Sequence, residues 1–181
     1  MSGKLTLISS ATASGSSSIS FTSGIDSTYD EYVFYCVDIH PASNSVLFTF
    51  QVNASGGSGF NETITSTYFD ADNLEAGGGG TLQYETGDDQ AQGTAYQRIT
   101  RATGNDADAC AAGVLHLFSP SSTSKVKHFY SRFEEYYTAS PRIIDNFSAG
   151  YINTTSAITE IDFKFSSGNI DTGNIYMFGV S

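Results

Sequence analysis

The stretch Ser-Val-Leu-Phe-Thr-Phe-Gln-Val-Asn, residues 45–53, places apolar side chains at every second position. One face carries Val46, Phe48, Phe50 and Val52, and the other carries Leu47, Thr49, Gln51 and Asn53. Side chains of a β-strand alternate between two faces, so this period predicts a strand with one face buried and the other in water. Residues 161–165, Ile-Asp-Phe-Lys-Phe, alternate in the same way.

The same alternation recurs along most of the chain. Residues 32–39 are apolar on nearly both faces, which predicts a strand in the interior of a sheet. Further strands are expected at residues 4–9, 18–22, 62–69, 113–118, 125–136, 143–153 and 174–180. Turn signals such as Ser23-Gly24 and Ser167-Gly168 separate them, and no stretch has the period of a long amphipathic helix.

About ten short strands without helices predict an all-β fold. We expect an antiparallel two-sheet β-sandwich, jelly-roll-like, formed by residues 1–181 as a single domain. An immunoglobulin-like sandwich is less favoured because the chain has no Trp. Residues 70–112 contain four consecutive Gly and long polar runs. They predict a loop-rich excursion with at most one or two short strands, which is the best place to look for partner contacts.

The charge balance excludes several classes of partner. The chain of 181 residues has 8 Lys and Arg against 19 Asp and Glu, which gives a formal net charge of -11. Nucleic acids and anionic membranes require clustered cations, so neither is an expected partner. The 13 Phe and 11 Tyr argue against disorder.

The first twenty residues and the two cysteines predict the compartment of synthesis. Residues 1–20 lack the basic and apolar regions of a secretory signal, and no segment predicts a transmembrane helix. Cys36 lies in an apolar run and Cys110 in an Ala- and Gly-rich stretch, so two free thiols are favoured over a disulfide. We expect synthesis in a reducing cytosol.

Histidines and acidic pairs are the candidate chemical groups. If His116 and His128 sit on neighbouring antiparallel strands, their imidazoles could face each other and bind zinc or copper, but neither they nor His40 have a third ligand at a diagnostic spacing. Carboxylate pairs occur at Asp30-Glu31, Asp88-Asp89, Glu134-Glu135 and Glu160 with Asp162. Only Glu160 and Asp162 would share a strand face, as a hydrolytic dyad requires, and their alternation with apolar residues places that face in water.

Calcium and carbohydrate are the remaining candidate ligands. Asp70, Asp72 and Asn73, and likewise Asp106 and Asp108, place oxygen ligands two residues apart in expected loops, without the Gly and Glu of an EF-hand. Aromatic platforms for glycans are expected at Tyr29, Tyr68, Tyr84 or Tyr136-Tyr137, although most tyrosines suit sheet edges and subunit contacts better. The nucleophile elbow, the P-loop and the dinucleotide fingerprint are missing from the sequence. We predict no enzyme, no catalytic residue, no cofactor and no metal ligand.

Several segments resemble a family of small virion proteins of tailed phages, especially marine phages and cyanophages. They are residues 19–34 (ISFTSGIDSTYDEYVF), 56–67 (GGSGFNETITST), 115–123 (LHLFSPSST), 149–158 (AGYINTTSAI) and 165–180 (FSSGNIDTGNIYMFGV). The resemblance covers most of the chain apart from residues 70–112. It implies a jelly-roll-like sandwich displayed outside a capsid or on a fibre, with no catalytic residues to carry over.

The resemblance implies a role and a set of partners. We expect a non-enzymatic virion protein on the particle exterior, a capsid decoration or cement subunit or a knob or head-fibre subunit. It would assemble in the host cytoplasm against the major capsid or another virion protein, as a homo-oligomer with a trimer favoured. The alternative is a tail-fibre or tail-tip receptor-binding module that contacts host surface glycan. A β-sandwich glycan hydrolase using Glu160 and Asp162 is a third hypothesis.

Overall fold

The computed structural model describes residues 3–181, and this part of the chain forms thirteen strands and contains no helix, so it offers none that could cross a membrane. The strands are β1 (Leu5–Ser16), β2 (Ile19–Phe21), β3 (Glu31–Pro41), β4 (Phe48–Ala54), β5 (Ile64–Leu74), β6 (Gly80–Tyr84), β7 (Ala91–Gly93), β8 (Gln97–Arg98), β9 (Ala111–Phe118), β10 (Lys127–Tyr137), β11 (Arg142–Ile152), β12 (Ile158–Phe165) and β13 (Ile170–Val180).

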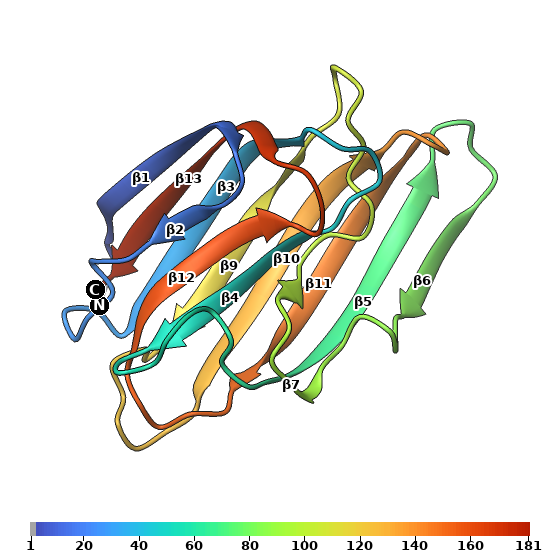
Figure 1. Cartoon of the computed structure of the whole chain (residues 1–181). Helices are drawn as coiled ribbons and strands as arrows, with labels where there is room; N and C mark the ends of the chain where they lie inside the picture. Colours follow the sequence, from blue (N-terminus) through green and yellow to red (C-terminus); the bar gives the residue numbers. More distant parts are fainter. Residues whose placement is uncertain (1–2) are drawn as a thin grey trace.

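The strands form two antiparallel sheets of unequal size. The larger sheet has nine strands, in the order β1-β13-β3-β9-β10-β11-β5-β6 with β7 also paired to β5. The smaller sheet has four strands, in the order β2-β12-β4-β8. Figure 1 shows the smaller sheet lying in front of the larger one. The prediction of an all-β, antiparallel two-sheet sandwich is confirmed.

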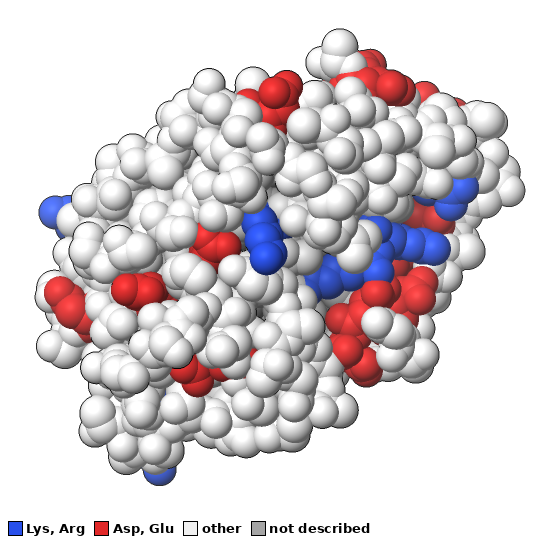
Figure 2. Space-filling model, viewed as in Figure 1, with Lys and Arg blue, Asp and Glu red and all other residues white. Residues whose placement is uncertain are grey.

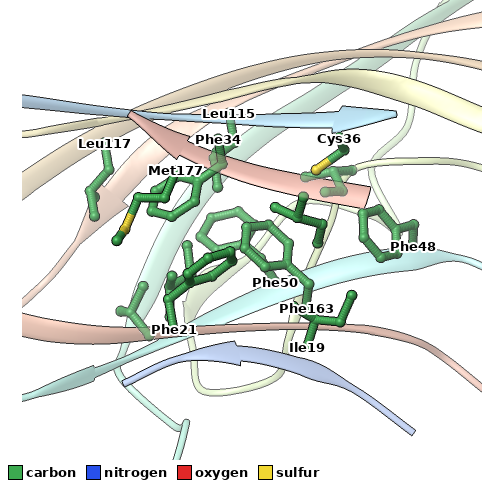
Figure 3. Close-up of a cluster of buried hydrophobic side chains, with 14 of the residues drawn as sticks. Ile19, Phe21, Phe34, Cys36, Phe48, Phe50, Leu115, Leu117, Phe163 and Met177 are labelled. Atoms are coloured by element: carbon green, nitrogen blue, oxygen red, sulfur yellow. The ribbon is translucent and has the colours of Figure 1, made fainter. Parts of the chain in front are cut away.

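Aromatic side chains fill the space between the sheets (Figure 3). Phe48 and Phe50 of β4 and Phe163 of β12 are fully buried, and Phe163 meets Phe34 of β3 from the larger sheet. The Phe163 ring centroid lies 5.6 Å from that of Phe34, 5.9 Å from that of Phe48 and 6.4 Å from that of Phe50. The alternation of residues 45–53 and 161–165 therefore marked the core face of the smaller sheet correctly.

The interior strand expected at residues 32–39 is β3, which lies between β13 and β9. The expected number of strands is too low, because β6, β7 and β8 form inside residues 70–112. The excursion predicted there is partly wrong for the same reason: residues 70–74 extend β5, β6 and β7 add to the larger sheet, and β8 adds to the smaller one. The segment thus ties the two sheets together along one side of the sandwich.

The expectation that Gln51 faces water is wrong. Its side chain is fully buried, and its Nε2 donates hydrogen bonds to the backbone carbonyls of Glu62 (3.0 Å), Thr94 (3.2 Å) and Ala95 (3.0 Å). Thr94 and Ala95 precede β8 and cover the outward side of β4. The period of two identified the core face, but a distant segment buries the opposite face as well.

Candidate functional site

The nine-stranded sheet has one face turned away from the smaller sheet, which we call the outer face. Alternation along β10 shows its direction: Phe129 and Phe133 are buried in the core, whereas Tyr130 and Arg132 between them are exposed. Every large hydrophobic side chain that is exposed in residues 3–181 lies on the outer-facing positions of this sheet. They are Leu5, Leu7, Tyr35, Val37, Phe69, Leu82, Tyr84, Tyr130 and Ile143.

The outer face exposes a large apolar area. Its four most exposed aromatic side chains leave between 38% and 53% of their surface in water. At about 200 Å² per side chain, they contribute roughly 350 Å² of aromatic surface. The five exposed aliphatic side chains add to this sum, which is distributed over the sheet from β1 at one end to β6 at the other. A sheet face that leaves so many large apolar side chains in water is a candidate protein contact site.

Stacking holds the rings of the outer face in place. The rings of His116 and Tyr130 stack with centroids 4.4 Å apart, and those of Phe69 and Phe147 stack at 4.8 Å. Tyr35 meets the edge of Phe178 at 5.6 Å. Side chains already fixed by neighbours lose little conformational entropy when a partner docks on them, which favours binding.

Charges on the outer face are few and paired. Arg132 donates hydrogen bonds to both carboxylate oxygens of Asp145, at 3.0 and 2.9 Å, and its guanidinium lies over the Phe147 ring. His116 Nδ1 lies 2.5 Å from Glu31 Oε1. A partner that docks here meets little unpaired charge, so the cost of removing charged groups from water is small.

A buried polar network occupies the inner side of the same sheet. The carboxylate of Glu135 on β10 accepts hydrogen bonds from the backbone N–H groups of Arg101 (2.6 Å) and Ala102 (2.9 Å) and from the Thr103 hydroxyl (2.7 Å). Beside it, Asn146 Oδ1 accepts a hydrogen bond from the fully buried Tyr68 hydroxyl at 2.5 Å. The network fastens the segment after β8 to the larger sheet.

Three of the four arginines gather at the edge of this network. Arg98, Arg101 and Arg142 line a cavity of about 360 Å³ together with Tyr137 and Ile144. Figure 2 shows basic side chains gathered in a hollow of the front face with acidic ones beside them. Their partners are Asp88 for Arg98, Asp70 for Arg101 and Asp72 for Arg142. Because carboxylates already occupy these guanidinium groups, we assign the cluster to holding residues 85–101 against β5 rather than to binding an anion.

The pH dependence of stability tests the buried network. Burial raises the pKa of Glu135, and its hydrogen bonds from Thr103, Ala102 and Arg101 oppose that shift. A carboxyl with a raised pKa in the folded state stabilises the protein below its ordinary pKa of about 4.3, and this contribution is lost as the pH rises through the folded value. The advantage of the wild type over Glu135→Gln in free energy of unfolding should therefore fall as the pH rises above about 4.3. Urea unfolding measures it, and an advantage that grows with pH would contradict this reading.

The structure changes the interpretation of the histidines. The hypothesis that His116 and His128 face each other is wrong, because the register of β9 and β10 places Tyr130 directly opposite His116. His40 lies on β3 and not on β9 or β10, and its Nε2 is 3.2 Å from the backbone oxygen of Asp106. Within residues 3–181, no group of three His, Cys, Asp or Glu side chains could hold a metal ion.

The carboxylates expected to share an exposed face do not do so. Asp162 is buried, where it accepts hydrogen bonds from the hydroxyls of Ser20 (2.5 Å) and Tyr96 (2.9 Å), while Glu160 accepts one from the Asn53 amide (2.9 Å). The loop around Tyr96 covers Asp162, which the alternation of β12 alone could not indicate. Members of the other acidic pairs have separate partners: Glu31 lies by His116, Asp88 by Arg98, and Glu135 in the buried network.

The calcium candidates separate into a strand pair and a loop pair. Asp70 and Asp72 lie on β5 and not in a loop, so that expectation is wrong. Hydrogen bonds from Thr81 and Arg142 hold the pKa of Asp72 below its ordinary value, whereas burial raises the pKa of Asp70. Asp108 lies in a loop and lines a cavity of about 590 Å³ with, among others, His40, Asp38, Cys110 and Asp171.

The tyrosines and cysteines also differ in their surroundings. Tyr68 is fully buried and so cannot serve as a glycan platform, whereas Tyr29 is half-buried against the core and Tyr84 is exposed. Both cysteines are free thiols, as favoured from the sequence, and burial raises the pKa of Cys36. The outer face was not predicted from the sequence, although the alternating rings along β10 and β11 were a signal for it.

Comparisons with known proteins identify no family. No family model matches the chain, and no curated protein matches it. A solved structure from Bacteroides ovatus, described as a structural genomics protein of unknown function, aligns over 58% of this chain with a TM-score of 0.32 and 7% sequence identity. The aligned part spans 45% of that chain. A likeness at this level says nothing about function.

Proposed function

We propose that this chain is a non-enzymatic structural subunit on the exterior of a phage particle, a capsid decoration or cement subunit or a knob or head-fibre subunit. The outer face of the nine-stranded sheet is the observation that carries this proposal, because it is a large apolar surface with paired charges. Its occupant is the major capsid protein or another protein of the particle. The sequence resemblance to small virion proteins supports the choice of a phage particle.

The distribution of acidic residues suits this orientation. Of the 19 acidic residues, only a few lie on the outer face, among them Glu31, Glu134 and Asp145, and all three have partners there. If the outer face docks on the particle, most of the formal charge of -11 stays in water. Such a charge keeps the free subunit soluble without opposing attachment.

Binding to particles that lack the subunit tests this proposal. Tyr130→Lys with Ile143→Lys places two charges in the outer face. Removing these charges from water on docking costs free energy, so we expect binding to purified particles to fall by tenfold or more. The matched control, Thr155→Lys with Ser167→Lys, adds the same charge at exposed positions flanking β12 and should bind like the wild type. Wild-type chain that fails to bind the particles, or equal binding by both double variants, would overturn the proposal.

A receptor-binding module on the tail is the second candidate, and Tyr84 is the observation that favours it. Its ring is 53% exposed, and its hydroxyl donates a hydrogen bond to Asp89 at 2.6 Å. A ring beside a carboxylate can stack on a sugar and accept hydrogen bonds from its hydroxyls. Tyr84→Ala should then reduce adsorption of particles to host cells, and unchanged adsorption would count against this candidate.

A further inference from the structure

Strand β1 forms one edge of the nine-stranded sheet. It pairs with β13 on one side, and no strand in residues 3–181 pairs with its other side. With 12 residues, β1 is about twice as long as the average strand of about 5–6 residues. A free edge of this length presents a row of unpaired backbone N–H and C=O groups, which is a template for another strand.

Two of the usual protections of an edge strand, charged side chains and proline, are missing from β1. No charged residue and no proline occurs between Leu5 and Ile25, and the exposed side chains along the regular part of the strand are small hydroxyl groups such as Ser10, Thr12 and Ser14. One register shift, between Leu7 and Ser9, interrupts the pairing with β13. The opposite edge is different: β6 has five residues and is followed closely by Glu85 and Asp88.

The hydrogen-bond pattern shows which groups of β1 are free. Lys4 and Ser181 exchange backbone hydrogen bonds of 2.9 and 3.2 Å, so both point toward each other. Backbone groups alternate in direction along an antiparallel strand, and therefore those of Leu5 and Leu7 point away from β13. The side chains of the same two residues are exposed on the outer face.

We propose that a second copy of this chain pairs with the open edge, β1 against β1 in antiparallel orientation about a two-fold axis. In such a pair, each residue meets a residue of the same strand, so a charged edge would repel itself and the uncharged β1 does not. The chain carries a net charge of -11, so its other surfaces oppose self-association more strongly.

The pairing has consequences for the assembly. It joins two nine-stranded sheets edge to edge, with the N-terminal end of each β1 beside the C-terminal end of the other, so that the two outer faces become continuous. Because the two-fold contact uses the open β1 edge of both copies, no further copy can add there. The pairing therefore gives a dimer in place of the trimer that the sequence resemblance implies. It does not depend on the proposed virion role, because it concerns the free protein in solution.

Mass measurement of the full chain tests the pairing. By sedimentation equilibrium, the wild type should approach twice 19.3 kDa as its concentration rises. Ser10→Lys with Ser14→Lys places like charges across the β1 pair and should raise the dissociation constant by roughly tenfold. The matched control, Thr67→Lys with Asn73→Lys, adds the same charge to exposed outer-face positions of β5 and should dimerise like the wild type.

A monomer at every concentration, a trimer, or a dimer that only the β5 control weakens would overturn the pairing. Hydrogen exchange on the unmodified chain gives a second readout that needs no variant. The amides of Leu5 and Leu7 should exchange more slowly as the protein concentration rises. Exchange rates that do not change with concentration would overturn the pairing too. None of these results bears on particle binding, so the two proposals fail separately.

Discussion

Phe163→Ala lowers the free energy of unfolding by about 4 kcal/mol, because it opens a cavity between the two sheets. The ring is fully buried and is surrounded by Phe34, Phe48 and Phe50. These neighbours are fixed by the hydrogen bonds of β3 and β4, so they cannot move far enough to fill the space. Equilibrium unfolding in urea measures the loss.

Phe69→Ala is the matched control for this prediction. It deletes the same ring from the outer face, where Phe69 is 38% exposed and stacks on Phe147. We expect a loss of about 1 kcal/mol, the contribution of one aromatic pair. Equal losses for the two variants would contradict the position of the core given by the structure.

Glu135→Leu lowers the free energy of unfolding by about 3 kcal/mol, because it leaves buried donors without an acceptor. The N–H groups of Arg101 and Ala102 both donate to Glu135 Oε1, and no water can replace a carboxylate that is 1% exposed. The segment after β8 should loosen first. Hydrogen exchange at the amides of Arg101 and Ala102 should accelerate alongside the loss measured by urea unfolding.

Glu134→Leu provides the comparison at the neighbouring position. Glu134 points to the outer face, where its nearest partner is Arg132 at 3.4 Å. Exposed ion pairs of this kind contribute about 0–1 kcal/mol, so the variant should unfold almost like the wild type. If both leucine variants unfolded alike, the Glu135 network would have no role in stability.

The alternation of apolar residues predicted the core well, because the sequence of a strand alone determines which of its side chains share a face. Phe48, Phe50 and Phe163 lie at alternate positions of their strands, and the apolar run at residues 32–39 marked an interior strand. The bounds of β1 were less predictable: the expected strand stops at residue 9, whereas β1 continues through small residues to Ser16. Such residues carry little periodic signal, and pairing with β13 holds them in place.

Contacts between residues distant in the sequence determine the features that the pattern of residues did not predict. Gln51 and Asp162 alternate with apolar residues and are expected in water, but Ala95 and Tyr96 cover them from a distant segment. The short strands β6 to β8 have few apolar residues, and polar contacts such as those of Glu135 order their surroundings. A period of two identifies the faces of a strand, but it does not show whether a second apolar face is covered or exposed. The outer face of the nine-stranded sheet was therefore missed.

Under the proposed function this chain belongs to a phage particle, and a cryo-electron microscopy map of that particle tests the proposal most directly. The map should show many copies of the sandwich on the exterior, with the outer face, centred on Tyr130, buried against a particle protein. Residues 85–95 and the four-stranded sheet should face the solvent. Particles without density for the sandwich, or sandwiches whose outer face lies in water, would contradict the proposal.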